Sequence, residues 1–399
     1  MNMRTNNKGI YIHIPFCVEK CLYCDFLSGK AKDEEKQQYV AALKKEIRLT
    51  GKMLAKIETA DEHPKAQPVD TVFFGGGTPS ILPGEIIADI LTEMRRCFAL
   101  TADCEITVEC NPGTLTTEKL KCYKVAGVNR ISLGLQSAEN HLLKKIGRIH
   151  TYEQFLQSYE MAKQAGFDNI NIDLMSGLPG QTMSDLISTL DKIVALRPTH
   201  ISAYSLILEE ETPLARMNEA GYATLPDEES EMEMYRYITD FLQENGYQRY
   251  EISNYCLPGR ECRHNLRYWD VSDYLGVGVG AASLCDGRRY RNISKREEYV
   301  RLLTSETGID VLGRLREEEQ NLTENEQMEE FAFLGLRKTA GISKVDFAQR
   351  FGKDIHFVYG HVIKKLLDWQ LLEEDETYLR LTSRGIDMSN EVLAEFLLS

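Results

Sequence analysis

The chain has 399 residues, of which 43% are hydrophobic and 27% are charged, and its formal net charge is −14. This composition is that of an ordinary soluble globular protein. Its acidity argues against DNA or RNA as the main ligand, because neutralising a phosphate backbone requires clustered Lys and Arg. No run of about eighteen apolar residues occurs and residues 1–8 are polar, so neither membrane insertion nor secretion is expected. Ten cysteines are too few for a disulfide scaffold in a chain of this length. We therefore expect a reducing compartment, the cytoplasm.

The first predicted element is a buried strand at residues 10–14, which ends at Pro15. The loop after it carries Cys17, Cys21 and Cys24 in the spacing Cys-x3-Cys-x2-Cys. Three thiolates so close together can bind one face of a cubane iron–sulfur cluster and leave one iron without a protein ligand. A structural zinc site is the alternative, but it needs four ligands, and no His or Cys follows Cys24 at finger spacing. The spacing therefore favours a cluster with an open iron.

Helices and strands then alternate as far as residue 206. Helices are predicted at residues 33–57, 83–98, 116–126, 138–165 and 182–196, with a loop at 56–68. The further strands are predicted at 69–74, 104–109, 130–135, 169–175 and 200–206. Six strands separated by helices imply a parallel sheet with right-handed crossovers. The pattern predicts an α/β fold built on a barrel or a partial barrel.

Polar residues or glycines follow the predicted strands, at the edge where a barrel places its active site. Besides the cysteines, they are Gly-Gly-Gly-Thr at 75–78, Glu109, Gln136 and Asp173. Consecutive glycines let the backbone approach a ligand closely, and carboxylates suit the two hydroxyls of a ribose. Each feature alone has a simpler explanation, such as a glycine-rich turn or a strand-end cap. Together they predict a ligand site.

Beyond residue 206 the predicted elements are an acidic loop, a helix and an added strand, at residues 209–214, 227–245 and 250–255. The segment Cys-Arg-His-Asn-Leu-Arg-Tyr-Trp follows at 262–269. His264 within it has two interpretations. It is either a hydrogen-bonded histidine in an aromatic cluster or an axial ligand to haem iron, with Tyr268 and Trp269 flanking the flat macrocycle.

The last part of the chain predicts a small winged-helix-like domain. An acid-rich linker at 317–326 precedes a helix through residue 338, helices at 343–351 and 355–369, a two-stranded wing at 374–381 and a last helix. Winged helices often bind DNA, but the acidity here favours a protein contact or a lid. The predicted domains are residues 1–235 for the barrel, 236–306 for an extension that carries His264, and 307–399 for the C-terminal domain.

The cysteine motif after an N-terminal strand resembles the signature of the radical S-adenosylmethionine (SAM) superfamily. Nearly the whole chain looks like the branch that contains oxygen-independent coproporphyrinogen III dehydrogenase and the HemW-type haem chaperones. The resemblance implies a partial (β/α)6 TIM-like barrel, a [4Fe–4S] cluster on Cys17, Cys21 and Cys24, and SAM on the fourth iron, where reductive cleavage yields a 5′-deoxyadenosyl radical. The residues that it assigns to SAM or its surroundings are Tyr11, Tyr23, Gly76, Gly77, Thr78, Glu109, Gln136, Arg148 and Asp173.

Within this branch the chain resembles the chaperones more than the dehydrogenase. The dehydrogenase pattern has a fourth cysteine where this chain has Phe26, and a longer N-terminal extension. His264, Asn265, Tyr268 and Trp269 resemble the His-Asn-x-x-Tyr-Trp motif of HemW-type proteins and are implied to contact haem. The implied function is a haem carrier that uses an electron donor for its cluster and passes haem to an acceptor haemoprotein, with a membrane-associated protein as the candidate acceptor. The rival functions are oxidative decarboxylation of coproporphyrinogen III in porphyrin biosynthesis, and another radical SAM reaction such as RNA modification, against which the missing basic patch argues.

Overall fold

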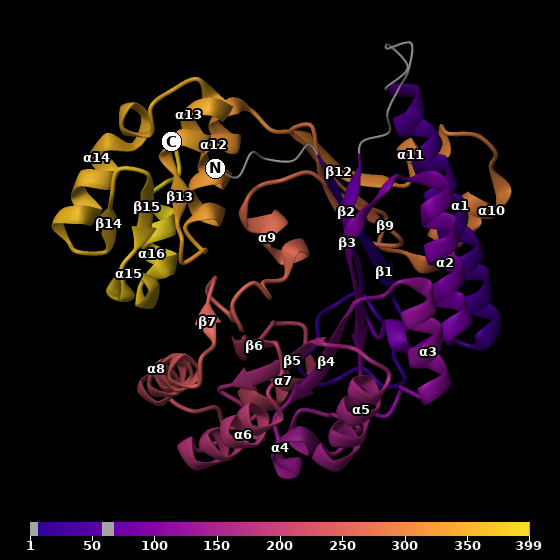
Figure 1. The fold of residues 1–399 in the computed structure, drawn as a ribbon, viewed down its shortest axis with the longest axis horizontal. Coiled ribbons are helices and arrows are strands. Elements are labelled where there is room, and N and C mark those ends of the chain that lie inside the picture. Colours follow the sequence, from indigo (N-terminus) through magenta and orange to yellow (C-terminus); the bar gives the residue numbers. More distant parts are fainter. Residues whose placement is uncertain (1–6, 58–67, 399) are drawn as a thin grey trace.

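Six parallel strands form the centre of one open sheet in a computed structural model, which describes residues 7–57 and 68–398 (Figure 1). They are β1 (Lys8–Ile14), β2 (Val69–Gly76), β3 (Leu100–Cys110), β4 (Arg130–Gln136), β5 (Asn169–Ser176) and β6 (His200–Ser205). Each strand pairs in parallel with the next one along the chain. The predicted partial barrel is confirmed, and it stays open because β1 and β6 do not pair. The loop predicted at 56–68 lies almost wholly outside the described residues.

Helices cover the outer face of these strands (Figure 1). They are α1 (Asp33–Ile57), α2 (Gly84–Cys97), α3 (Thr117–Ala126), α4 (Asn140–Lys145), α5 (Tyr152–Gln164) and α6 (Met183–Leu196), with the short 3-10 helix η2 (Pro79–Ile81) after β2. Capping boxes at Thr151 and Thr182 begin α5 and α6, because each hydroxyl accepts the N–H three residues later and that residue's side chain bonds back. Such local signals explain why the sequence predicted these helices closely.

The chain after residue 245 extends both edges of the central sheet. β7 (Gln248–Arg249) and β8 (Asn254–Cys256) follow β6 at one edge. At the other edge β9 (Tyr274–Val277) pairs in parallel with β1, and β10 (Ala282–Cys285), β11 (Arg288–Asn292) and β12 (Arg316–Asn321) continue the sheet. The strand predicted at 250–255 is wrong in position, because only its last two residues belong to β8. The linker predicted at 317–326 is also wrong, because β12 forms an edge of the main sheet.

Five further helices belong to the main body. They are α7 (Pro213–Glu219), α8 (Glu228–Glu244), α9 (Arg263–Trp269), α10 (Arg296–Ser305) and α11 (Val311–Arg314). The predicted helix at 227–245 is confirmed as α8, whose N-cap Asp227 accepts a hydrogen bond from the N–H of Ser230. In the part of the chain that the structure describes, no helix has both the length and the apolar character of a membrane span.

The C-terminal part has a hydrophobic core of its own, which shares no residue with the core of the main sheet. Its elements are α12 (Glu324–Gly335), β13 (Ile342–Ser343), α13 (Lys344–Phe351), α14 (Ile355–Asp368), β14 (Leu372–Glu374), β15 (Tyr378–Leu381), α15 (Ser383–Asp387) and α16 (Ser389–Ala394). The three strands pair in the order β13-β15-β14, so the predicted wing has one strand more than expected. The winged-helix-like prediction is confirmed, whereas the domain boundaries at 235 and 306 stay predictions.

Candidate functional site

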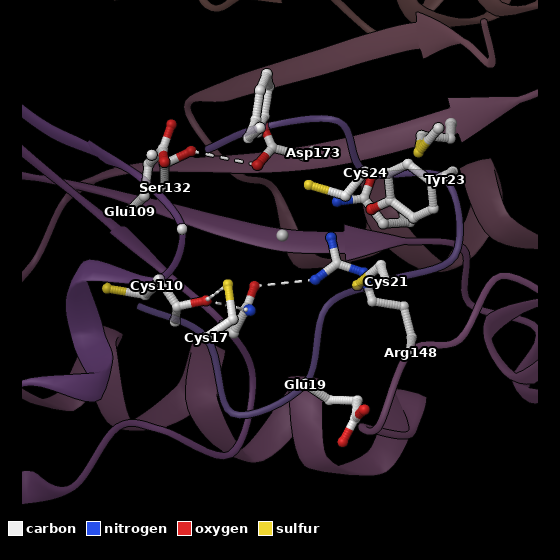
Figure 2. A pocket seen from close by; sticks show the side chains of 18 of the residues that line it. Cys17, Glu19, Cys21, Tyr23, Cys24, Glu109, Cys110, Ser132, Arg148 and Asp173 are labelled. Atoms are coloured by element: carbon white, nitrogen blue, oxygen red, sulfur yellow. Dashed lines mark hydrogen bonds between the residues drawn. The ribbon is translucent and has the colours of Figure 1, made fainter. Parts of the chain in front are cut away.

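A cavity of about 340 Å³ lies at the carboxyl ends of the central strands, where the sequence predicted a ligand site. The loop after β1 contributes Cys17, Cys21, Tyr23 and Cys24 to it (Figure 2). The strand ends and the segment before α5 contribute Gly76, Gly77, Thr78, Glu109, Gln136, Arg148 and Asp173. Of the residues predicted for the cluster and SAM, Tyr11 alone does not line this cavity. The fold therefore gathers eleven of twelve predicted residues.

The three cysteine thiols of the loop are half-buried and line the cavity. Burial raises the pKa of Cys21 and of Cys24, and the positive charge of Arg148 opposes this rise at Cys21. Cys17 Sγ lies 3.6 Å from Thr78 Oγ1. A metal that replaces the thiol protons would offset the cost of burying the thiolates. Three thiols on one loop fit an iron–sulfur cluster with an open iron, and Cys110 of β3 is a fourth, buried thiol in the wall of the same cavity.

A chain of hydrogen bonds links the cysteine loop to the opposite wall (Figure 2). Arg148 Nη1 donates to Asn111 Oδ1 at 3.0 Å, and Asn111 Nδ2 donates to Thr78 Oγ1 at 2.9 Å. Arg148 Nε is buried and has no hydrogen-bond partner among the described residues, so one donor remains for an anionic ligand group. The sequence analysis missed Asn111, although it follows Glu109 by two residues at the end of β3.

Gly76 and Gly77 bring the backbone after β2 directly against the cysteine loop. Gly76 has φ +109°, which L side chains rarely adopt. A Cβ on Gly77 would lie 2.7 Å from the carbonyl oxygen of Phe16. That oxygen accepts the N–H of Thr78 at 2.7 Å, and the N–H of Gly77 donates to Ile14 O at 2.9 Å. A side chain at residue 77 would therefore displace the residue that precedes Cys17.

We expect Gly77→Ala to lower the iron content of the reconstituted protein and to cost about 1–3 kcal/mol of unfolding free energy through overpacking. The measurement is iron per chain after anaerobic reconstitution, together with denaturant unfolding. Gly29→Ala is the matched control, because a Cβ on Gly29 would have no atom within 4 Å although Gly29 pairs with the same loop at Phe16. Equal iron contents in the two variants would contradict the expectation.

Two carboxyl groups, Glu109 and Asp173, form the inner end of the cavity (Figure 2). Asp173 accepts hydrogen bonds from Asn171 Nδ2 at 2.7 Å and from Ser132 Oγ at 3.5 Å. Burial and the nearby charge of Asp173 raise the pKa of Glu109 to about 8, although the N–H of Gly76 opposes the rise. Burial also raises the pKa of Asp173. Hydroxyl donors of a ligand, such as those of a ribose, suit this pair of acceptors.

The stability of the ligand-free protein is expected to depend on pH through Glu109. Its pKa is 4.5 in the unfolded chain and about 8 in the folded one, so its contribution is fully present below pH 4.5 and is lost as pH rises to about 8. Glu109→Gln should therefore gain stability relative to wild type across this range, on the order of 4 kcal/mol by pH 8. Denaturant unfolding between pH 5 and 8 measures the difference. The exposed Glu118→Gln is the control, and parallel curves for wild type and Glu109→Gln would contradict the expectation.

Two other predicted residues have unexpected surroundings. Gln136 is buried at the end of β4 with φ +75°, at an irregularity in the pairing with β5. Such conformations gather at functional sites, because the surrounding fold must compensate for them. Tyr11 lies deeper inside the sheet, with its hydroxyl 3.1 Å from His13 Nδ1 and its ring stacked on Phe73.

A second cavity, of about 170 Å³, lies inside the sheet and is lined by His264, Asn265 and Tyr268 of α9. His264 is 1% exposed. Its Nδ1 lies 2.9 Å from Thr71 Oγ1, and its Nε2 lies 3.0 Å from the hydroxyl of Tyr268. Burial lowers the pKa of His264 to about 3, so the ring is neutral at physiological pH. Both ring nitrogens lie within hydrogen-bond distance of a partner, as expected for a hydrogen-bonded histidine in an aromatic cluster. An axial-ligand role stays a prediction, because one of these two hydrogen bonds would have to break before the nitrogen could bind haem iron.

Comparison with known proteins places the chain in a family. Residues 11–193 match the model of the radical SAM superfamily, and residues 322–388 match the HemN C-terminal domain. Proteins named heme chaperone HemW from Lactococcus lactis and Bacillus subtilis are each 38% identical to the chain, over 97% and 98% of it and 97% and 99% of their own lengths. The chain belongs to the HemW family. An Escherichia coli member is 34% identical over 98% of both chains.

The fold of this HemW-family chain is also that of a solved structure. Coproporphyrinogen III oxidase (HemN) from Escherichia coli, described as a radical SAM enzyme, superposes with a TM-score of 0.83. The match covers 99% of this chain and 91% of the other at 23% identity, and it therefore concerns the fold alone.

Buried charges hold α9, which carries the His-Asn motif of this HemW-family chain, against the sheet. Arg267 of the motif forms a buried ion pair with Asp70 of β2, and its Nε donates to Thr71 Oγ1 at 3.1 Å. At the start of α9, the N–H of His264 donates to Glu105 Oε1 at 3.1 Å. These bonds hold the His-Asn motif of α9 against β2 and β3.

The HemW-family site also contains residues that sequence reasoning did not single out. Besides Asn111, the cavity is lined by Ser132, Met175 and Tyr204, which lie on β4, β5 and β6. A serine, a methionine or a tyrosine in a strand is an ordinary core or surface residue, so its type gave no signal. Because side chains point alternately to the two faces of a strand, Ser132 could have been placed on the same face as Gly134, Met175 on that of Asp173 and Tyr204 on that of Ser202.

Proposed function

We propose that this protein is a haem chaperone, which binds haem and passes it to an acceptor haemoprotein. One observation carries the proposal: HemW-family relatives that match nearly the whole chain are named heme chaperones. Phe26 supports the carrier over the decarboxylase, because it stands where the dehydrogenase pattern has a fourth cysteine. We place the activity in the cytoplasm and propose a membrane-associated haemoprotein as the acceptor.

The proposal includes a [4Fe–4S] cluster and SAM in the cavity of about 340 Å³. Cys17, Cys21 and Cys24 would hold the cluster. The backbone of Gly76 and Gly77, with Thr78, would hold the methionyl part of SAM, the free donor of Arg148 would face its carboxylate, and Glu109 and Asp173 would accept from its ribose. When bound, these groups supply reductive cleavage of SAM, which requires an electron donor as a further partner.

Haem is proposed to bind beside α9. Asn265 and Tyr268 line the inner cavity and also a larger cavity on the other side of the helix, which Trp269 lines as well. The motif thus stands between the radical SAM site and that larger cavity. Its aromatic rings offer the apolar, flat surface that a porphyrin needs.

The test is an anaerobic haem titration of the cluster-reconstituted protein, followed by absorption spectra and by transfer to an apo-haemoprotein. We expect saturable binding of about one haem per chain and transfer to the acceptor. His264→Ala, with the exposed His141→Ala as control, reports whether His264 ligates iron, because loss of an axial ligand changes the spectrum. Absence of saturable binding by wild type, or turnover of coproporphyrinogen III at an enzyme-like rate, would overturn the proposal.

A further inference from the structure

A cavity of about 590 Å³ lies between the main sheet and the C-terminal domain. Its walls come from α8 and α9 on one side and from α15 and α16 on the other (Figure 1). Tyr204 lines both this interdomain cavity and the cavity of the cysteines. Its volume is that of a small-molecule site, about 300–1,000 Å³. The interdomain cavity can therefore accept a ligand that also reaches the radical SAM site.

Apolar side chains form an exposed wall of the interdomain cavity. Ile207 is 71% exposed and Tyr204 is 40% exposed, and the half-buried ring of Trp269 lies on the same wall. Large apolar side chains that remain exposed together mark binding surfaces. An aromatic ring beside an aliphatic side chain offers contact to a flat apolar molecule.

Arg337 supplies a positive charge that forms no ion pair with the described residues, although it interacts electrostatically with the buried Glu251 of the same cavity. Its guanidinium lies over Trp269, with Cζ 4.8 Å from the ring centroid. Among the described residues no carboxylate lies within ion-pair distance of it, and its Nε is buried without a hydrogen-bond partner. It is the one basic residue among the described ones that line the interdomain cavity. An anionic ligand group would satisfy this cation.

The carboxylates of the same cavity have other surroundings. Asp387 pairs with Arg236 at 2.8 Å. Glu251 is 1% exposed, and burial raises the pKa of Glu251 and of Glu231. Glu228 lies in the first turn of α8, where the helix dipole favours a negative charge. Among these carboxylates Glu251 alone has a recorded interaction with Arg337, whose charge opposes the rise in the pKa of Glu251, and no hydrogen bond joins the two side chains among the described residues.

We infer that haem occupies the interdomain cavity, with its macrocycle against Trp269 and Ile207 and a propionate on Arg337. The inference rests on the proposed function and deepens it, because it assigns the haem site to the junction of two domains. The cavity beside His264 supports this location, because its volume of about 170 Å³ is much smaller than that of the interdomain cavity. The C-terminal domain then contributes a ligand-binding residue and selects tetrapyrroles with free carboxylates.

The experiment compares the affinities of haem and of haem dimethyl ester for the full-length, reconstituted protein. Arg337→Gln should weaken haem binding by about tenfold or more, the equivalent of a lost charge-assisted hydrogen bond, and should leave the affinity for the ester within about twofold of wild type. Arg337→Lys should restore part of the loss. Arg384→Gln is the matched control, because it removes the same charge from the exposed surface of α15.

Unchanged haem affinity in Arg337→Gln, or an equal loss for haem and its ester, would overturn the inference while leaving the proposed function intact. Failure of the wild-type protein to bind haem would overturn the proposed function and the inference with it. Far-ultraviolet circular dichroism and thermal unfolding of each variant check that a loss of binding is not a loss of the fold. The side chain of Arg337 lies over Trp269 and forms no ion pair with the described residues, so we expect its replacement to leave the fold unchanged.

Discussion

Cys21→Ala is expected to abolish assembly of an iron–sulfur cluster in this protein. Cys21 is one of the three loop thiols in a cavity that Cys110 of β3 also lines, and with one loop thiolate missing the cluster would have two ligands from the loop instead of three. The other cysteines of the chain lie on other elements. Cys110 of β3 lines the same cavity, but its thiol is buried and donates to the backbone oxygen of Val108 at 3.5 Å, so we do not expect it to replace a loop cysteine. The measurement is iron and sulfide per chain after anaerobic reconstitution, with the visible absorption spectrum. Both contents should fall to background, and Cys17→Ala and Cys24→Ala should behave alike.

Cys122→Ala is the matched control, because Cys122 is a half-buried cysteine on α3 that contacts Glu85 and lies outside the cavity. It should retain the full iron content. A Cys21→Ala protein with wild-type iron content would contradict the assignment of the three thiols. Zinc in place of iron in the wild-type protein would revive the alternative that the spacing left open.

Asp70→Ala should lower the free energy of unfolding by about 3–5 kcal/mol, because it leaves the buried charge of Arg267 without its partner. Asp70 is 6% exposed and Arg267 is 8% exposed. The guanidinium also donates to Thr71 Oγ1 and to the backbone oxygen of Asp273, so it cannot turn to solvent without losing these bonds. Denaturant unfolding measures the loss, and weaker binding of haem should accompany it because α9 carries the motif.

Asp103→Ala provides the contrast. Asp103 pairs with Arg263 at 3.3 Å, but its side chain is 77% exposed, and such surface pairs contribute about 0–1 kcal/mol. Both carboxylates connect α9 to the neighbouring strands, but Asp70 is buried and pairs with Arg267 and also with Arg263 at 3.6 Å, whereas Asp103 is exposed and pairs with Arg263 alone among the described residues. Similar losses of unfolding free energy in Asp70→Ala and Asp103→Ala would mean that the Arg267–Asp70 pair does not anchor α9.

The sequence predicted the central fold well because local signals and the long-range pattern agree there. Thr151 and Thr182 cap helices where the apolar periodicity begins, β4 is buried along its whole length, and β5 is buried at most of its residues. The predicted site residues converge for a topological reason: residues at the carboxyl ends of adjacent parallel strands must meet at one edge. Glu109, Gln136 and Asp173 were therefore predictable as neighbours without knowledge of any contact.

The sequence could not predict features that depend on distant pairing. β9 to β12 are short, and β12 reads Arg-Glu-Glu-Glu-Gln-Asn, a polar run that is typical of a linker until it pairs with β11. His264 is similar, because the hydrogen bonds that engage its two ring nitrogens come from Thr71 on a distant strand and from Tyr268. Arg337 showed no motif at all, and its role depends on the C-terminal domain packing near α9.

The extension of the sheet at both edges also bears on whether its edges can pair with another molecule. The pairing of β9 with β1 and of β8 with β6 covers two largely buried strands that would otherwise offer free N–H and C=O groups to another molecule. The strands left at the rims are β12, which carries three consecutive glutamates, and β7, which has two residues. A charged strand and a very short strand are poor templates for intermolecular pairing. The segment that carries the His-Asn motif therefore also protects the radical SAM core against aggregation.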